Sequence, residues 1–345
     1  MDRRQNMVTR LVGFLVLIFG HLLPAQAQDI SPWTETVINV RDLQASSALF
    51  LKLGQWRIVS EDAMTEGEFR YWKLPSNNAG RYRLICAPKA SSGCIRFIQI
   101  NGTDKQMPIR AALRPWDIGG IFSTMVRSDN VEQLYRDALK LGWWAESPPI
   151  RFQFGSSDLR NVVLRGPDGV NLAVYERISP SFTGFPLGRI SQGFNSMRMV
   201  RDKNIARDFY RDKLGFGILF DADSDFPDPA FSNLSIPLNY TPKIKRIATA
   251  LHPKPGETGR IEVMQIEGFT GRDVSGAASL PNLGIISVRY PVDDLGRYQK
   301  QLESKSVDIE YSAKRVPIGG LGVINLIAVR DPDGSITEFY ETVQE

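Results

Sequence analysis

The chain has 345 residues, enough for two domains of ordinary size, and is 42% hydrophobic and 23% charged. These values are typical of a globular protein and exclude a disordered or fibrous one. The formal net charge is +4, and the sequence has no dense basic stripe with interleaved aromatic residues. We therefore expect no nucleic-acid partner.

The N-terminus has the pattern of a secretory signal peptide. Three arginines in the first ten residues precede the short apolar run Leu11–Gly20, and Ala25-Gln26-Ala27 provides a small-x-small cleavage pattern. An uncleaved anchor is the alternative, but the run is short for crossing a bilayer. The sequence predicts removal of residues 1–27, a mature chain of net charge +2, a periplasmic or secreted location, and no membrane attachment after cleavage.

The two cysteines, Cys86 and Cys94, flank a short segment that is predicted to connect two strands of a hairpin. In an oxidising compartment they would form a cross-strand disulfide, whereas in the cytosol they would remain thiols. Two cysteines without histidine neighbours make a poor zinc site. We favour the disulfide.

Four segments share one pattern, in which a strand and a charged turn lead into an amphipathic helix, which is followed by further strands. An Asp near the end of the first strand is suited to cap the helix, and the first three helices are predicted to end at Leu-Gly. The predicted first strands and helices are Glu35–Leu43 with a helix over about 44–53, Ile121–Val126 with a helix ending at Leu141-Gly142, Asn195–Asp202 with a helix over 205–213, and Ile286–Leu295 with a helix to about 304.

Two of the segments close with the same predicted β-hairpin. The apolar run Val323–Val329 is followed by Asp331-Pro332-Asp333-Gly334, whose residues favour a tight turn, and by an alternating strand that contains Glu338. The alternation places Glu338 on an interior face, where a carboxylate must be paired, protonated or bound to a metal. The earlier copy of this hairpin spans residues 162–176.

The chain contains an internal duplication. Residues 93–102 match residues 259–268 at an offset of 166, and the two Pro-Asp-Gly turns match at an offset of 165. Loop-like linkers are expected near 103–118 and 269–283, and the aperiodic stretch 178–192 is a natural boundary. The sequence therefore predicts two domains, residues 33–177 and residues 193–343.

These motifs resemble those of the vicinal oxygen chelate superfamily, which includes the glyoxalase I, bleomycin-resistance and extradiol dioxygenase families. The resemblance rests on Phe209-Tyr210 with Leu214-Gly215-Phe216, on the Asp-Pro-Asp-Gly-x-x-x-Glu pattern ending at Glu338, and on the repeated modules. It covers nearly all of residues 33–343. It implies an α+β fold of two tandem domains, each made of two paired βαβββ modules that form a curled mixed sheet around a cavity. One fold supports many chemistries, so the activity stays open.

In that superfamily the metal ligands, usually His or Gln and Glu, lie on the first and last strands of paired modules. The resemblance places Asn195, Ser287, Glu262 and Glu338 at these positions in the C-terminal domain. In the N-terminal domain it places Glu35, Arg96, Ser123 and Ala173 there, with a slip of one residue left open at Ser123. Glu35 and Arg96 are expected to form an internal ion pair; the alternative is that Arg96 receives an anionic ligand.

The histidines exclude an extradiol dioxygenase. His21 would leave with the signal peptide, and His252 lies outside the strands that carry ligands, so the chain lacks a site of two histidines and a carboxylate. Oxygen ligands alone suit Mg²⁺, Mn²⁺ or Ca²⁺. A metal, if present, would be held by Glu262, Glu338 and Asn195.

Two functions remain open from the sequence. The first is an exported protein, a monomer or homodimer, that binds a small organic ligand in the C-terminal cup without a cofactor, with Asn195, Ser287, Arg96 and Glu35 as candidate ligand-binding residues. The second is a metal-dependent lyase, isomerase or epimerase of the glyoxalase type, with Glu262 and Glu338 as catalytic residues. Carboxylates covered by Arg198, Arg289 or Arg330 would favour the first.

Overall fold

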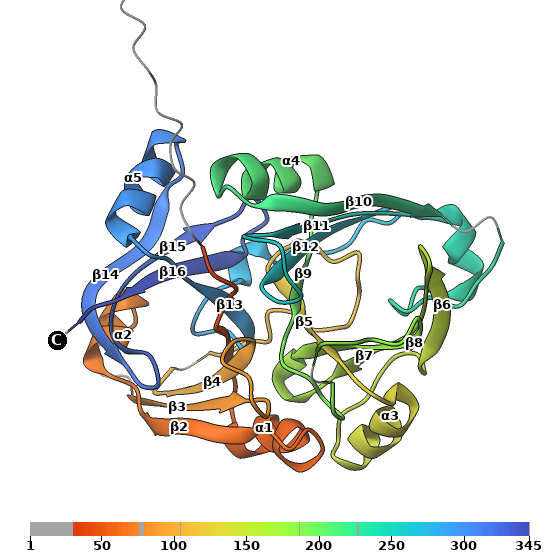
Figure 1. The fold of residues 1–345 in the computed structure, drawn as a ribbon, viewed down its shortest axis with the longest axis horizontal. Helices are drawn as coiled ribbons and strands as arrows, with labels where there is room; N and C mark the ends of the chain where they lie inside the picture. Colours follow the sequence, from red (N-terminus) through yellow and green to blue (C-terminus); the bar gives the residue numbers. More distant parts are fainter. Residues whose placement is uncertain (1–29, 76–78, 104, 186, 226–227, 345) are drawn as a thin grey trace, which may run out of the picture.

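The computed structural model describes residues 30–344 except 76–78, 104, 186 and 226–227, and not the side chains of 224 and 225. The predicted signal peptide, residues 1–27, lies outside the described residues. Two curled mixed sheets of eight strands lie side by side, with all but one of the α-helices on their outer faces (Figure 1). The predicted α+β class, with paired βαβββ modules forming curled sheets, is confirmed.

The first sheet has the strand order β14-β15-β16-β13-β1-β4-β3-β2. Its helices are α1 (Leu43–Lys52), α2 (Glu66–Tyr71) and α5 (Leu295–Ser304). Its strands are β1 (Glu35–Asn39), β2 (Arg57–Ala63), β3 (Ala79–Cys86), β4 (Cys94–Asn101), β13 (Gly284–Pro291), β14 (Ile309–Ile318), β15 (Gly322–Arg330) and β16 (Ile336–Thr342).

The second sheet has the strand order β10-β11-β12-β9-β5-β8-β7-β6. Its helices are α3 (Val131–Lys140) and α4 (Lys203–Asp208), which continues into a π-helical turn at Phe209–Lys213. Its strands are β5 (Ile121–Arg127), β6 (Ile150–Phe154), β7 (Ser157–Arg165), β8 (Asn171–Ser179), β9 (Asn195–Met199), β10 (Gly217–Asp225), β11 (Lys245–His252) and β12 (Arg260–Glu267). Short 3₁₀ turns occur at Pro167–Gly169, Leu238–Lys243 and Ser275–Ala277.

The modules pair differently from the prediction. The first module (β1–β4) joins the fourth (β13–β16), and the second (β5–β8) joins the third (β9–β12). The seams are the antiparallel pairs β1–β13 and β5–β9. Each sheet therefore takes one module from 33–177 and one from 193–343, so the predicted boundary separates the repeats but not the sheets. Either pairing completes the hydrogen bonds of a module's first strand, so the module pattern alone does not choose between them.

Helix caps and a shared core fix these elements. Asp42, Asn130, Asp202 and Asp294 precede the four helices predicted from the sequence, and each side chain accepts hydrogen bonds from backbone N–H groups of the first turn. The largest apolar cluster packs the helices of both sheets together and includes Phe50, Trp143, Tyr210 and Phe339. The two sheets therefore share one core.

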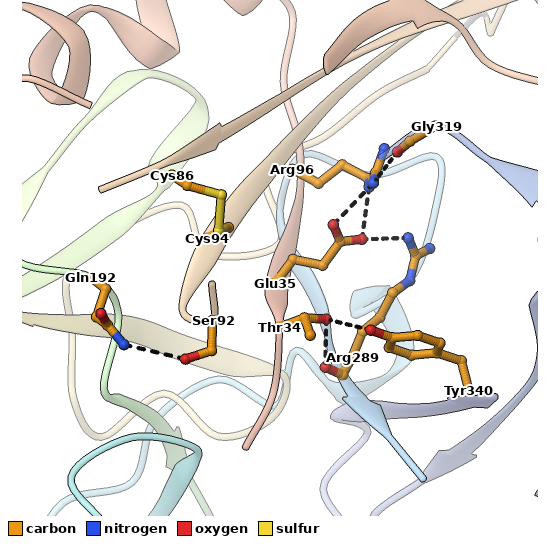
Figure 2. Close-up of a disulfide and its surroundings, with 10 residues drawn as sticks. All are labelled: Thr34, Glu35, Cys86, Ser92, Cys94, Arg96, Gln192, Arg289, Gly319 and Tyr340. Atoms are coloured by element: carbon orange, nitrogen blue, oxygen red, sulfur yellow. Dashed lines mark hydrogen bonds and ion pairs between the residues drawn. A yellow bond between two sulfur atoms is a disulfide. The ribbon is translucent and has the colours of Figure 1, made fainter. Parts of the chain in front are cut away.

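The disulfide predicted between Cys86 and Cys94 is present and joins the ends of β3 and β4 (Figure 2). The residues of this hairpin lie in register from Ala79 opposite Asn101 to Ile85 opposite Ile95. None of the helices in the described part of the chain is long and apolar enough to span a bilayer.

Candidate functional site

Strand register identifies equivalent positions in the two sheets. We call the concave faces of the first and second sheets the first cup and the second cup. In the first sheet Val37 pairs with Ser287 across the antiparallel seam and with Arg96 on the parallel neighbour β4; below, 'opposite' denotes the antiparallel partner and 'beside' the parallel one. In the second sheet Met197 is opposite Ser123 and beside Glu262. Ser123 is therefore the counterpart of Ser287, which resolves the possible slip of one residue, and Glu262 is the counterpart of Arg96.

The remaining positions follow from the same seams. Glu35 is opposite Arg289, which lies beside Glu338. Asn195 is opposite Met125, which lies beside Ala173. The first cup thus holds Glu35, Arg96, Ser287 and Glu338, whereas the second holds Asn195, Glu262, Ser123 and Ala173.

The expectation that Glu262 and Glu338 share one cup is wrong, because they lie in different sheets. The metal set of Glu262, Glu338 and Asn195 is therefore not assembled. No group of three or more His, Cys, Asp or Glu side chains suited to a metal occurs among the described residues. Neither donor set fits the metal that the family resemblance implies: the first cup pairs its carboxylates with arginines, and the second has a single carboxylate.

The first cup contains a buried network of ion pairs. Arg96 donates two hydrogen bonds to the Glu35 carboxylate, at 2.7 and 3.0 Å, so the predicted Glu35–Arg96 ion pair is confirmed. Arg289 donates hydrogen bonds to both carboxylates, to Glu35 at 2.7 Å and to Glu338 at 2.5 Å. Ser287 also donates to Glu338. Figure 2 shows Glu35 between the two guanidinium groups.

The charges in this network balance one another. Burial raises the pKa of Glu35, but attraction to Arg96 and Arg289 outweighs burial and holds the pKa below its usual value. Burial disfavours the charge of Arg289, but Glu338 and Glu35 raise its pKa overall. Two guanidinium cations thus take the electrostatic role that a metal would have beside two carboxylates. The coverage of Glu338 by Arg289 is the arrangement that favours the non-metal function.

Large side chains and a loop seal the first cup. Tyr82 and Leu84 fill the concave face of β3, and the Tyr82 ring lies 4.7 Å from the Arg96 guanidinium. The β14–β15 turn folds over them, and the carbonyl of Gly319 accepts a hydrogen bond from Arg96 at 2.7 Å. A Cβ on Gly319 would collide with the Tyr82 hydroxyl, so this close approach requires glycine. Glu338 is 0% exposed as a result.

Helix α2, which was not predicted from the sequence, completes the seal of the first cup. The sequence Thr65-Glu66-Gly67-Glu68 forms a capping box, in which the Thr65 hydroxyl accepts from the Glu68 N–H and the Glu68 carboxylate accepts from the Thr65 N–H. The Thr-x-x-Glu spacing was the signal in the sequence from which this helix could have been predicted. The helix delivers buried Tyr71 and Trp72 into the cluster that includes Tyr82 and Tyr340.

The second cup presents a different carboxylate. Glu262 accepts a hydrogen bond from Asn195 Nδ2 at 3.0 Å, and in the described part of the chain no Lys or Arg forms an ion pair with it. Burial raises the pKa of Glu262 to about 7, although the Asn195 bond opposes the shift. Glu262 is nevertheless 9% exposed, unlike the sealed Glu338. At neutral pH the Glu262 carboxyl is therefore about half protonated, so a proton partly compensates its charge.

The second cup is also lined by smaller side chains. Ala250, opposite Glu262 on β11, is the counterpart of Leu84, and Ala248 is the counterpart of Tyr82. Ala173 stands where the first cup has Glu338. The apolar cluster that lines this cup includes Met125, Met197, Met264 and Phe194.

Several polar atoms in the second cup lack partners. Ser123 Oγ and Asn161 Oδ1 are buried without a hydrogen-bond partner among the described residues. Tyr175, the neighbour of Asn161 on the same face, is half-buried, and the nearby Glu262 adds to the burial that raises its pKa. Buried polar atoms in folded proteins are nearly always hydrogen-bonded, so unpaired ones call for an occupant such as water or a ligand.

Arg198 and Arg330, which were also candidates to cover the carboxylates, lie elsewhere. Arg198 points to the helix side of its sheet, where it lies 3.9 Å from Asp331 and over the ring of Tyr210. Arg330 pairs with Glu310 at 3.1 Å. Neither covers Glu262 or Glu338.

Comparisons with known proteins agree with this architecture. Residues 196–339 match the family model described as the Glyoxalase/Bleomycin resistance protein/Dioxygenase superfamily. This segment contains the third module and nearly all of the fourth, which belong to different sheets. A search of curated proteins found no match.

Solved structures of low sequence identity share the fold. Glyoxalase I from Zea mays superimposes with a TM-score of 0.56 at 14% identity, covering 90% of this chain and 92% of that one. A point mutant of the same protein gives a TM-score of 0.59 at 15% identity, covering 90% and 94%. A protein described as a putative dioxygenase from Bacillus subtilis gives 0.54 at 11% identity, covering 92% and 87%. At these identities the likeness establishes the fold alone.

Proposed function

From the premise that the chain belongs to the glyoxalase/bleomycin resistance/dioxygenase superfamily, we propose that it is an exported protein that binds a small organic ligand in its second cup. In this proposal the binding needs no histidine-containing metal site. The first cup acts as a structural counterpart, in which ion pairs and aromatic side chains occupy the space.

The contrast between Glu262 and Glu338 carries the proposal. Glu338 is sealed and paired with Arg289, whereas Glu262 is slightly exposed and hydrogen-bonded to Asn195. Keeping a carboxyl group in an apolar site without a cationic partner costs stability, so its retention there favours a functional role.

The polar groups of the second cup define what they can recognise. The carboxyl of Glu262 can donate when protonated, and Ser123 and Tyr175 can donate or accept. They are set among Met and Phe side chains, and a few polar groups within an apolar lining is the usual composition of a small-molecule site. A carboxyl whose pKa is about 7 can also exchange a proton with a bound ligand, which leaves room for acid–base chemistry.

The metal-dependent alternative lacks its donor set, because Glu262 and Glu338 occupy different cups. We expect millimolar Mg²⁺, Mn²⁺ or Ca²⁺ to leave the melting temperature unchanged, since only a ligand bound to the folded state raises it. A cation-dependent rise that is lost in Glu262→Gln would instead support a metalloenzyme.

A cup-filling substitution tests the proposal. Fluorine NMR would first identify fluorinated fragments that bind the wild type. Ala250→Leu gives the second cup the residue that the first cup has at Leu84, and should abolish the binding of those fragments. Ala63→Leu, at an exposed position in β2, is the matched control and should bind as the wild type does. Fragments that bind both variants equally would place the site elsewhere and overturn the proposal.

Export is the second part of the proposal. The sequence pattern of residues 1–27 and the Cys86–Cys94 disulfide support it, because disulfides persist in oxidising compartments.

A further inference from the structure

Three arginines gather at one end of the second cup. Arg127 on β5 and Arg260 on β12 both pair with the Glu257 carboxylate, at 2.7 and 3.2 Å. Arg177 on β8 joins them through Phe182, whose ring lies 4.4 Å from the Arg127 guanidinium and 4.6 Å from that of Arg177. We call these three arginines the arginine cluster. Among the described residues its ion pairs involve a single carboxylate, so positive charge is in excess there.

Arg127 connects this cluster to the interior of the cup. It is the strand neighbour of Tyr175 on the cup face, and its guanidinium lies 4.0 Å from the ring of Phe194. Phe194 in turn packs against Tyr175, with ring centroids 6.3 Å apart. This end of the cup is also close to Glu262. Arg260 precedes Glu262 by two residues on β12, and the backbone N–H of Arg260 donates a hydrogen bond to the carbonyl of Phe194.

Arg127 also has an unused donor. The residue is 8% exposed, and its Nε is buried without a hydrogen-bond partner in the described part of the chain. A buried donor without an acceptor typically costs about 1–3 kcal/mol. Burial lowers the pKa of Arg127 to about 10, so the group remains a cation at neutral pH. An anionic oxygen would satisfy both the donor and the excess charge.

We propose that the arginine cluster binds the anionic head of an organic acid, with the apolar body of that acid lying among Tyr175, Phe194 and Met125 in the second cup. The inference rests on the proposed function and assigns its ligand class. Guanidinium groups recognise carboxylates through charge-assisted hydrogen bonds, and the adjoining Phe and Met side chains suit an apolar body better than a hydrated inorganic anion.

A matched pair of compounds tests the charge requirement on the full chain. Para-fluorophenylacetate and its neutral amide, para-fluorophenylacetamide, differ only in the head group, and fluorine NMR titration gives both affinities. We expect the acid to bind at least about tenfold more tightly than the amide. Arg127→Met should weaken the acid by about tenfold or more and change the amide by less than about twofold.

Three further variants keep the test decisive. Arg177→Met changes an exposed residue, so it should fold even if Arg127→Met does not, and should weaken the acid by about threefold or more. Glu257→Gln removes the competing carboxylate and should tighten acid binding. Arg70→Met removes the same charge from an exposed site on α2 and should change neither affinity.

The outcomes separate this inference from the proposed function. Equal affinities for acid and amide, no binding of either compound, or an acid affinity unchanged in both arginine variants would overturn the inference. The proposed function would still stand if other fragments bound the wild type and were lost in Ala250→Leu. Loss of acid binding in the arginine variants, together with an unaffected amide, would support the inference.

Discussion

Arg289 of β13 donates a hydrogen bond to Glu35 of β1 over 2.7 Å, and this ion pair crosses the seam between the first and fourth modules. The two residues are far apart in the sequence and lie in different halves of the duplicated chain. Their contact makes Glu35, which the family resemblance places at a metal-ligand position, part of a buried ion-pair network instead.

The first prediction concerns that network. Arg289→Met should lower the free energy of unfolding by about 3–5 kcal/mol, because it leaves the buried Glu338 carboxylate without its arginine. Denaturant unfolding measures this loss, and Arg57→Met at an exposed position of β2 is the control. Adding Glu338→Gln to Arg289→Met should recover part of the loss, since Glu35 keeps Arg96. A loss below about 1 kcal/mol, as for exposed ion pairs, would contradict the account.

The second prediction concerns the pH dependence of stability. The pKa of Glu262 is about 7 in the folded chain against an ordinary value of 4.5, so the folded state binds more protons between these values. Stability should therefore fall as the pH rises through this window, by up to about 3 kcal/mol.

Glu262→Gln should remove that dependence. The variant should exceed the wild type in stability by a margin that grows from about pH 5 to about pH 8, measured by denaturant unfolding at each pH. Glu267→Gln, at the exposed end of β12, should show no such growth. A constant difference across this range would mean that the pKa of Glu262 is close to its usual value.

The third prediction compares access to the two cups. Met264 on β12 is half-buried, and its counterpart on β4 is the fully buried Ile98. The native cysteines are joined in the disulfide, so Met264→Cys or Ile98→Cys would carry a single free thiol. In the native state Met264→Cys should react with Ellman's reagent at least about tenfold faster than Ile98→Cys. Equal native rates, after normalisation to the rates of the unfolded variants, would argue that both cups are sealed.

The fourth prediction concerns export and the disulfide. Protein recovered from its native compartment should have the mass of a chain beginning at Gln28, and Cys86 and Cys94 should resist alkylation until reductant is added. The variant with both cysteines changed to serine should lose about 2–3 kcal/mol of stability, because the bond closes a short loop. Freely alkylated thiols, or a mass that retains residues 1–27, would contradict an exported, oxidised protein.

Much of the local structure could be predicted from the sequence. Helix caps such as Asp42 and Asp294, the Asp-Pro-Asp-Gly turn before Glu338, and the cysteine spacing depend on interactions between residues close in the chain. The Glu35–Arg96 ion pair was also expected, because the family resemblance placed both residues at facing positions within a single module. Helix α2 was missed, although Thr65 and Glu68 have the spacing of a capping box.

By itself, the sequence determined four βαβββ modules, their order, and the interior position of Glu338 on its strand. Only the tertiary structure decided which modules share a sheet, and so which residues share a cup. The reason is that hydrogen bonding and apolar burial at a module's first strand can be satisfied by more than one partner strand, and nothing local distinguishes them. Pairing β1 with β13 brought Glu35 to Arg289 across the seam, and pairing β5 with β9 put Glu262 in a different cup from Glu338. That long-range choice separated the two glutamates, although both lie on the closing strand of a module.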